Sequence, residues 1–285
     1  MEIAGYTYSF DRQLRAGAID TAGAIRAHCE IGLRAHEVSD LYLRDDGELA
    51  AIEAALAETD GHVIVYDIAC DFVAPDGSAP RDQVARVERA VERAARLGAP
   101  KVLLVPGRTR EGVDPALVRR HFADVVGRCR DAARAKGMTA MIANLGLQAA
   151  YCGTTAHVRQ VRDAVGPDLL VTYDVGNYLM AGEDTLVALD RVAAWLGHVH
   201  FKDWRIVDAG APGAGAAFAG QDGRLYLSVA LGDGFVPLAA VLARLGALGY
   251  DGTITVEYEG PDDPASAIRR SIEHLNGLIA AGRSG

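Results

Sequence analysis

Short runs of apolar residues alternate with longer amphipathic stretches along the whole chain. Several runs are apolar without a break, such as Val-Ile-Val at 63–65 and Val-Leu-Leu-Val at 102–105. Unbroken apolar runs of this length are typical of parallel strands that helices cover on the outside. We therefore predict strands at Ile3–Ser9, Leu33–Val38, His62–Ile68, Lys101–Pro106, Thr139–Asn144, Leu169–Asp174, His198–Lys202 and Thr253–Tyr258.

The stretches between these strands carry helix signals. Asp114 followed by Pro115 is a typical pair of N-cap and first helical residue. After this pair, Val118 and Phe122 fall on one face at helical spacing, and Gly137 is the kind of residue that ends a helix. Other interstrand segments repeat the pattern, and one more helix is predicted after Pro264.

Strands that alternate with helices over 285 residues, without a linker, predict one (β/α)₈ TIM barrel spanning residues 1–285. A doubly wound open sheet is the alternative, but no GxGxxG or GxxxxGK[ST] turn follows any strand. The rhythm breaks at residues 207–226, a Gly/Ala-rich loop insertion. Because it follows strand seven, it falls on the catalytic face of such a barrel, where a lid or binding loop would lie; a floppy insertion is the other reading.

Charge and composition narrow the classes of partner. The formal net charge is −9, whereas a nucleic-acid binder needs Lys and Arg to neutralise phosphates, so we predict no nucleic-acid partner. No apolar stretch reaches the roughly 18 residues of a membrane span, and no signal-peptide pattern opens the chain, so no membrane partner is expected either. The cysteines at 29, 70, 129 and 152 form no CxxC pair, which favours a cytoplasmic location.

Polar side chains stand at the ends of three successive, otherwise apolar strands. Strand six ends in Asp174, strand seven carries His200, and strand eight carries Glu257. A polar group at such a position must be solvated, paired or bound to something, because bare burial costs several kcal/mol. An Asp, a His and a Glu form a mixed oxygen and nitrogen set suited to Mn²⁺, Mg²⁺, Co²⁺ or Zn²⁺. We therefore predict a divalent metal site there.

Four strings around these residues carry a resemblance. They are YDVGN at 173–177, HVHFKD at 198–203, LGDG at 231–234 and GYDGTITVE at 249–257. Together, in this order and spacing, they resemble the sugar phosphate isomerase/epimerase superfamily, the xylose isomerase-like TIM barrels. The similarity runs over nearly the whole chain. It implies the same barrel fold, a small sugar or polyol substrate, and possible assembly into homo-oligomers.

The resemblance also implies a metal-ligand set. Members usually bind one divalent metal through a Glu on strand five, an Asp on six, a His on seven and a Glu on eight. By position, the last three are Asp174, His200 and Glu257. In the strand-five segment MIANLG, Ala143 stands where the Glu is expected, followed by Asn144. The two Glu residues also form the acid/base pair in the ketose epimerases of this family.

Ala143 allows two interpretations. It marks a natural branch with weakened or absent metal and altered chemistry, or it is an engineered Glu-to-Ala substitution made to stop turnover and trap a ligand. We favour the second, since the other three ligand positions are intact; a vestigial site is the third reading. With Ala143 present, Glu257 or a water molecule is the only evident base, so the chain as it stands is expected to be slow or inactive.

Four further residues are candidates for binding the substrate. Glu37 ends strand two, His198 and Lys202 share one side of strand seven with His200, and Arg205 follows closely. Each also has a structural interpretation: a surface charge for Glu37, a packed histidine for His198, a salt bridge for Lys202 and a solvated side chain for Arg205.

Three functions are consistent with these observations. The first is a metal-dependent isomerase or epimerase that moves a proton in a sugar-like hydroxy-carbonyl compound through an enediolate. The second is a lyase or dehydratase of the same superfamily, such as one that removes water from an inosose. The third is a non-catalytic sugar-binding barrel. The endonuclease IV-like branch would need more metal-binding histidines and a basic face, and neither is evident.

Overall fold

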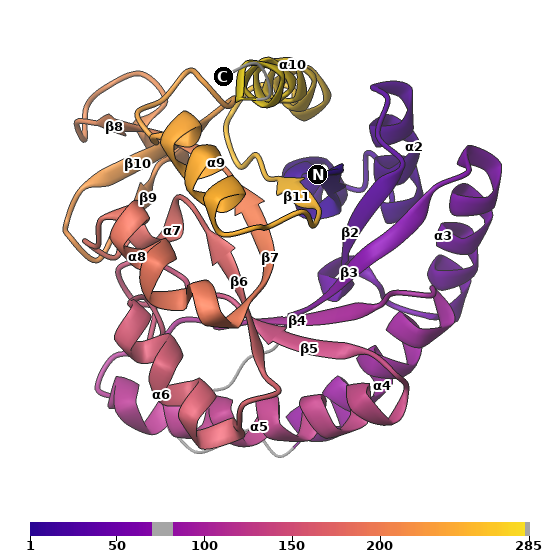
Figure 1. Ribbon diagram of the computed structural model, residues 1–285. Helices are drawn as coiled ribbons and strands as arrows, with labels where there is room; N and C mark the ends of the chain where they lie inside the picture. Colours follow the sequence, from indigo (N-terminus) through magenta and orange to yellow (C-terminus); the bar gives the residue numbers. More distant parts are fainter. Residues whose placement is uncertain (70–81, 283–285) are drawn as a thin grey trace.

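A closed barrel of parallel strands forms the centre of the molecule in the computed structural model, which describes residues 1–69 and 82–282. Each strand pairs in parallel with its neighbours, in the order β1-β11-β7-β6-β5-β4-β3-β2 (Figure 1). The fold is the predicted (β/α)₈ barrel. Its strands are β1 (Ile3–Tyr6), β2 (Ala35–Ser39), β3 (His62–Ala69), β4 (Lys101–Val105), β5 (Thr139–Ile142), β6 (Leu170–Asp174), β7 (Leu196–Phe201) and β11 (Ile254–Val256).

Helices surround the barrel and cover the outer faces of its strands (Figure 1). The N-cap predicted at Asp114 is present, because its carboxylate accepts a hydrogen bond from the backbone N–H of Ala116 at 2.9 Å. The helices are α1 (Asp11–Arg15), α2 (Thr21–Glu30), α3 (Asp46–Thr59), α4 (Gln83–Arg96), α5 (Pro115–Ala135), α6 (Thr155–Val165), α7 (Asn177–Met180), α8 (Thr185–Val192), α9 (Leu238–Ala247) and α10 (Pro264–Gly282).

The segment expected as a Gly/Ala-rich loop has secondary structure of its own. Strands β8 (Asp203–Val207), β9 (Phe218–Ala219) and β10 (Leu225–Val229) form a small antiparallel sheet in the order β8-β10-β9. Trp204 anchors this sheet, since its ring lies 5.9 Å from that of Phe218 and 6.1 Å from that of Tyr226. The glycines and alanines occupy only the middle of the segment, and the flanking residues pair as strands.

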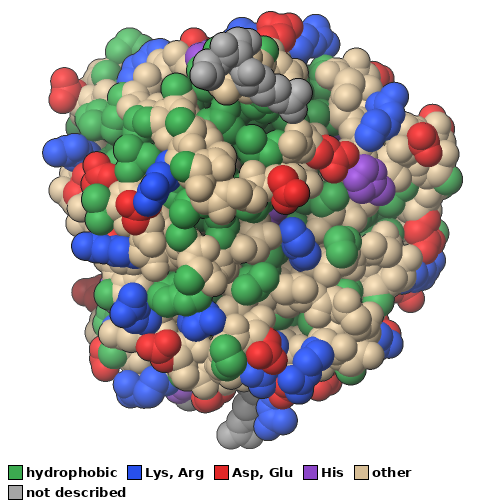
Figure 2. Space-filling model, viewed as in Figure 1, with side chains coloured by type: hydrophobic (Ala, Val, Ile, Leu, Met, Phe, Trp, Pro, Cys, Tyr) green, Lys and Arg blue, Asp and Glu red, His purple; other side chains and the backbone are tan. Residues whose placement is uncertain are grey.

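Charges of both signs mix on the face of the molecule seen in Figure 2. Figure 2 shows Lys and Arg side chains scattered among Asp and Glu on the viewed face. Among the described residues, no helix is both long and apolar enough to cross a membrane. Cys29 and Cys152 are free thiols, Cys129 is buried, and Cys70 lies outside the described residues.

Two buried histidines pack against each other between α2 and β2. The rings of His28 and His36 are stacked with centroids 5.6 Å apart, and neither side chain is exposed. Gly5 leaves the space for His28, because a Cβ atom there would lie 2.7 Å from the imidazole ring. Burial lowers the pKa of His28 to about 3 and that of His36 to about 4, so both rings are neutral at pH 7.

We expect this pair to make the protein sensitive to acid. Below pH 6.5 the unfolded chain protonates these histidines, whereas the folded chain, in which their pKa is lowered, does not. The free energy of unfolding is therefore highest above pH 6.5 and decreases as the pH falls towards 4. Each ring should contribute up to about 1.4 kcal/mol per pH unit to the fall in the free energy of unfolding. Urea unfolding between pH 7.5 and 4.5 measures this. His28→Phe should flatten the slope, whereas His274→Gln, at an exposed histidine, should leave it unchanged; equal slopes in both variants would contradict the prediction.

Candidate active site

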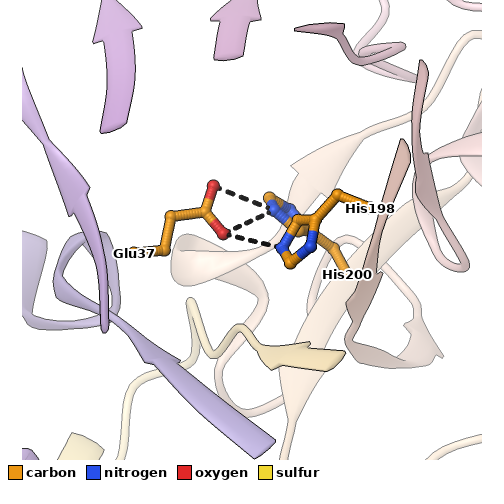
Figure 3. Close-up of side chains that lie close together, drawn as sticks. All are labelled: Glu37, His198 and His200. Atoms are coloured by element: carbon orange, nitrogen blue, oxygen red, sulfur yellow. Dashed lines mark hydrogen bonds and ion pairs between the residues drawn. The ribbon is translucent and has the colours of Figure 1, made fainter. Parts of the chain in front are cut away.

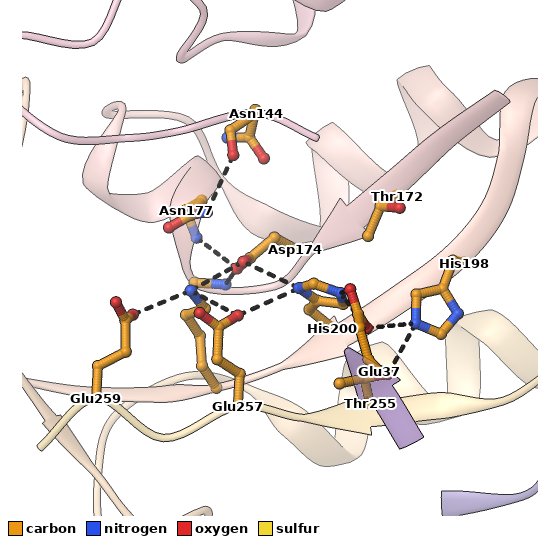
Figure 4. A network of polar contacts seen from close by, with 12 residues as sticks. Glu37, Asn144, Thr172, Asp174, Asn177, His198, His200, Thr255, Glu257 and Glu259 are labelled. Carbon is orange, nitrogen blue, oxygen red and sulfur yellow. Dashed lines mark hydrogen bonds and ion pairs between the residues drawn. The ribbon is translucent and has the colours of Figure 1, made fainter. Parts of the chain in front are cut away.

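The three predicted strand-end residues meet at the carboxyl end of the barrel. The Nδ1 atom of His200 lies 3.2 Å from Oε2 of Glu257 and 3.9 Å from Oδ2 of Asp174 (Figure 4). The three ligand atoms all lie within 4.8 Å of one another, and all three side chains are buried. The register of the barrel explains the meeting, since His200 pairs with Asp174 on β6 and with Thr255 on β11.

The Asp174 carboxylate is oriented by the turn that follows it. Its Oδ1 atom accepts hydrogen bonds from the backbone N–H groups of Gly176 and Asn177, both at 2.9 Å. Gly176 is required here, because a Cβ atom would lie 2.2 Å from Nε1 of Trp204. With Oδ1 occupied, Oδ2 is left to face His200 and Lys202.

Lys202 places a positive charge among the carboxylates. Its Nζ atom lies 3.0 Å from both Asp174 Oδ2 and Glu257 Oε2, and 3.2 Å from Glu259 Oε2. Burial lowers the pKa of Lys202, but the three carboxylates outweigh burial and raise it well above its usual value. The ammonium group therefore stays charged while buried.

Glu37 contacts both His200 and His198 in the barrel interior. Glu37 Oε2 lies 2.9 Å from Nε2 of His200 and 3.2 Å from Nε2 of His198 (Figure 3). Burial raises the pKa of Glu37, but the two imidazoles hold it below its usual range. Burial lowers the pKa of His198 to about 4, so this ring is neutral. Neither Glu37 nor His198 lines the cavity described next.

A cavity of about 280 Å³ opens over these residues. Its wall includes the apolar faces of Tyr6, Tyr8 and Phe218, and its polar side is formed by Asp174, His200, Lys202 and Glu257. Several buried polar atoms of the wall have no hydrogen-bond partner among the described residues: Asp67 Oδ1, Asn144 Oδ1 and Trp204 Nε1. Buried polar groups are normally paired, so these unpaired atoms mark the wall of the cavity as unusual.

Ala143 faces the same cavity from just beyond β5. Its methyl group packs with Val65, Leu103 and Met141 in an apolar cluster. Strand five therefore contributes no ligand atom at this position. The neighbouring Asn144 is held by its side-chain N–H group, which donates to Gly153 O at 2.8 Å.

Arg205 lies elsewhere. Its side chain is exposed on β8 and donates a hydrogen bond to Asp233 O at 3.0 Å, and it does not line the cavity. Its neighbour Asp203 is buried and accepts backbone N–H bonds from Trp204, Gly232, Gly234 and Val236, which fixes the LGDG segment. Substrate binding by Arg205 stays a prediction without a contact to support it.

Asp67 on β3 was not anticipated from the sequence. It lies in the run VIVYDIA at 63–69, where one carboxyl group interrupts apolar residues. That interruption is the same signal that drew attention to Asp174, but it stands within a strand rather than at its end. The side chain is 3% exposed and lines the cavity.

The comparison with known sequences decides the family. Residues 26–278 match the family described as "Xylose isomerase-like TIM barrel". The chain belongs to this family. It is 31% identical over 117 residues to an inosose dehydratase of Lacticaseibacillus casei, which covers 40% of this chain and 38% of that enzyme. It is also 28% identical over 190 residues to a putative hydroxypyruvate isomerase of Streptomyces coelicolor, covering 64% and 61%. The matches thus span less than two thirds of either relative.

A solved structure shows the same fold over the full length of the barrel. The D-psicose 3-epimerase of Clostridium cellulolyticum H10, determined with D-tagatose, superposes with a TM-score of 0.76. The match covers 98% of this chain and 99% of the epimerase at 13% identity. The relatives in sequence are thus a dehydratase and a putative isomerase, and the buried Asp, His and Glu groups of this chain could hold a metal ion.

We expect Lys202 to be required for stability as well as for the charge of the site. Lys202→Met would leave buried carboxylates without their cation, which should cost about 3–5 kcal/mol of the free energy of unfolding at pH 7. Lys136→Met is the matched control, because Lys136 makes only a surface ion pair with Glu92, worth about 0–1 kcal/mol. Urea unfolding compares the two variants, and similar losses would show that Lys202 is no more than an ordinary ion pair.

Proposed function

We propose that this chain moves a proton next to the carbonyl group of a small, sugar-like hydroxy-carbonyl compound, as an isomerase or epimerase. The observation that carries the proposal is the cavity, which combines buried cations, carboxylates and unpartnered polar atoms within about 280 Å³. A compound rich in hydroxyl groups would satisfy those atoms. The similarity to a putative hydroxypyruvate isomerase and the shared fold with a sugar epimerase support the same reaction class.

The donor set fits a divalent cation such as Mn²⁺, Mg²⁺, Co²⁺ or Zn²⁺. Asp174 Oδ2, His200 Nδ1 and Glu257 Oε2 lie close enough to share one ion, and their chemistry is that of such sites. When bound, a cation would act as a Lewis acid towards the substrate oxygens. We expect weak binding, because Ala143 supplies no fourth ligand and Lys202 already contacts both carboxylates.

Glu257 is the candidate base. It lines the cavity, and although burial raises its pKa, Lys202 and His200 hold the pKa below its usual value, so it is ionised at pH 7. In the proposed reaction Glu257 takes the proton from the carbon next to the carbonyl group. Lys202 offers a fixed positive charge to the oxygen on which negative charge develops. Glu37 and His198 position His200 rather than contact the substrate.

Restoring a carboxylate at position 143 tests the role of this residue. We expect Ala143→Glu to raise the bound divalent metal to about one equivalent and to raise proton exchange by about 10²–10⁴-fold, the usual contribution of an acid/base group. Metal content by plasma mass spectrometry and deuterium uptake from D₂O into a panel of ketoses are the measurements. Ala143→Gln, similar in size but uncharged, is the control and should gain neither. If Ala143→Glu also gains neither, its interpretation as a lost Glu ligand is overturned.

A dehydratase is the second candidate, supported by the 31% identity to an inosose dehydratase. It shares the first proton abstraction, so deuterium uptake would accompany loss of water, which product analysis with cyclic polyol ketones detects. A sugar-binding barrel without catalysis is the third, and it would bind ligand without deuterium uptake even in Ala143→Glu. A cytoplasmic location and a homo-oligomer complete the proposal.

A further inference from the structure

The carboxyl group of Asp67 is buried in the cavity wall, and one of its oxygens is unpaired within the part of the chain that the structure describes. Its side chain is 3% exposed, and its Oδ1 atom accepts no hydrogen bond from the described residues. Within residues 1–69 and 82–282, no Lys, Arg or His forms an ion pair with it. On the neighbouring strands Asp67 pairs with Ser39 and Leu103. Neither of these residues carries a positive charge.

Such a carboxyl group destabilises the folded state unless a bound ligand pairs with it. A buried polar atom without a hydrogen bond costs free energy, and a buried charge without a counterion costs more. Burial raises the pKa of Asp67 to about 8; the charge of His200 lowers the pKa and that of Glu257 raises it. At pH 7 the group is mostly a neutral carboxylic acid, which carries an O–H donor.

Asp40, a buried aspartate whose Oδ1 atom is paired, offers the contrast. Asp40 is 5% exposed, but its Oδ1 atom accepts the backbone N–H of Ala69 at 2.9 Å and lies 3.8 Å from Arg86. Asp40 does not line the cavity, whereas Asp67 does. Among the described residues, the Oδ1 atom of Asp40 is therefore hydrogen-bonded to the backbone, whereas that of Asp67 is not.

The position of Asp67 complements that of Glu257. Both line one cavity, but Glu257 is surrounded by cations whereas Asp67 has none at ion-pair distance among the described residues. The wall near Ala143 adds no acid, since it presents a methyl group. A proton-transfer reaction needs one group that accepts a proton and one that donates it.

We propose that Asp67 is a catalytic acid of this cavity, whose carboxyl O–H binds the substrate's carbonyl oxygen and donates its proton there while Glu257 removes the proton from carbon. The product of this step is an enediol, with Asp67 as carboxylate and Glu257 protonated. Asp67 then takes a proton from the enediol oxygen as Glu257 returns one to carbon, which restores both groups. The role of Asp67 as an acid rests on the proposed function. Its contact with a ligand in the cavity does not depend on that function.

Asp67→Asn tests the proton, because the amide keeps the shape and an N–H donor but transfers no proton. We expect deuterium uptake into the substrate to fall 100-fold or more with little change in KM, and the pH profile of kcat to lose its limb near pH 8. Asp67→Leu should weaken ligand binding as well, by tenfold or more in calorimetry with ketoses and polyols. The Ala143→Glu background supplies measurable turnover if the parent chain is slow. Unchanged turnover and pH profile in Asp67→Asn would overturn the acid role.

Measurements of thermal stability test the inference about Asp67 independently of the proposed function. Because Asp67 is unpaired, Asp67→Asn should keep or raise the thermal midpoint, whereas Asp40→Asn should lower it through its lost pairing. The gain in Asp67→Asn should grow from pH 4 to pH 8, since the raised pKa of Asp67 makes the folded state lose stability over that range. A fall like that of Asp40→Asn would show a structural group and overturn the inference. If no compound takes up deuterium, the proposed function fails, and the effect of Asp67→Leu on binding still decides the contact; unchanged or undetectable binding overturns it.

Discussion

The buried ion cluster around Lys202 is the interaction on which the site depends. Its ammonium group lies within 3.2 Å of oxygens from Asp174, Glu257 and Glu259. Carboxylates this close repel one another and would bind protons without a cation among them. Lys202 and His200 hold the pKa of Glu257 below its usual value, while burial leaves that of Glu259 at about 7. One end of the barrel thus holds carboxyl groups in different protonation states.

The cluster keeps its geometry because groups outside the cavity hold its members. Asp174 is fixed by backbone N–H groups of the following turn, and His200 is fixed by Glu37, which contacts it from the far side of the ring. Asp203 anchors the loop behind Lys202 in the same way. Each of these supports is backbone or a buried carboxylate, so the polar atoms of the cluster are held in place without a ligand, as the proposed proton transfer would require.

Most of the fold and part of the site could be predicted from the sequence, for separable reasons. The strands were predictable because they are buried on both faces and read as apolar runs, and Asp174, His200 and Glu257 follow from strand order. The contact of Glu37 with His198 was not, because β2 and β7 are separated by β1 and β11 and meet only across the barrel interior. Which oxygen lacks a partner, as at Asp67, depends on every neighbouring side chain, and no local pattern encodes it.

Charge balance connects Ala143 to the rest of the cavity. With strand five contributing a methyl group, the carboxyl groups of Glu37, Asp174 and Glu257 share two cations of the chain itself, Lys202 and protonated His200. A divalent ion on the same oxygens must displace the His200 proton and weaken the Lys202 contacts, because a ligating imidazole is neutral. A further carboxylate at position 143 would add negative charge that the chain's own cations do not neutralise. A divalent cation would supply the missing positive charge. We therefore expect the residue at this one position to shift the balance between the internal cations and a metal ion.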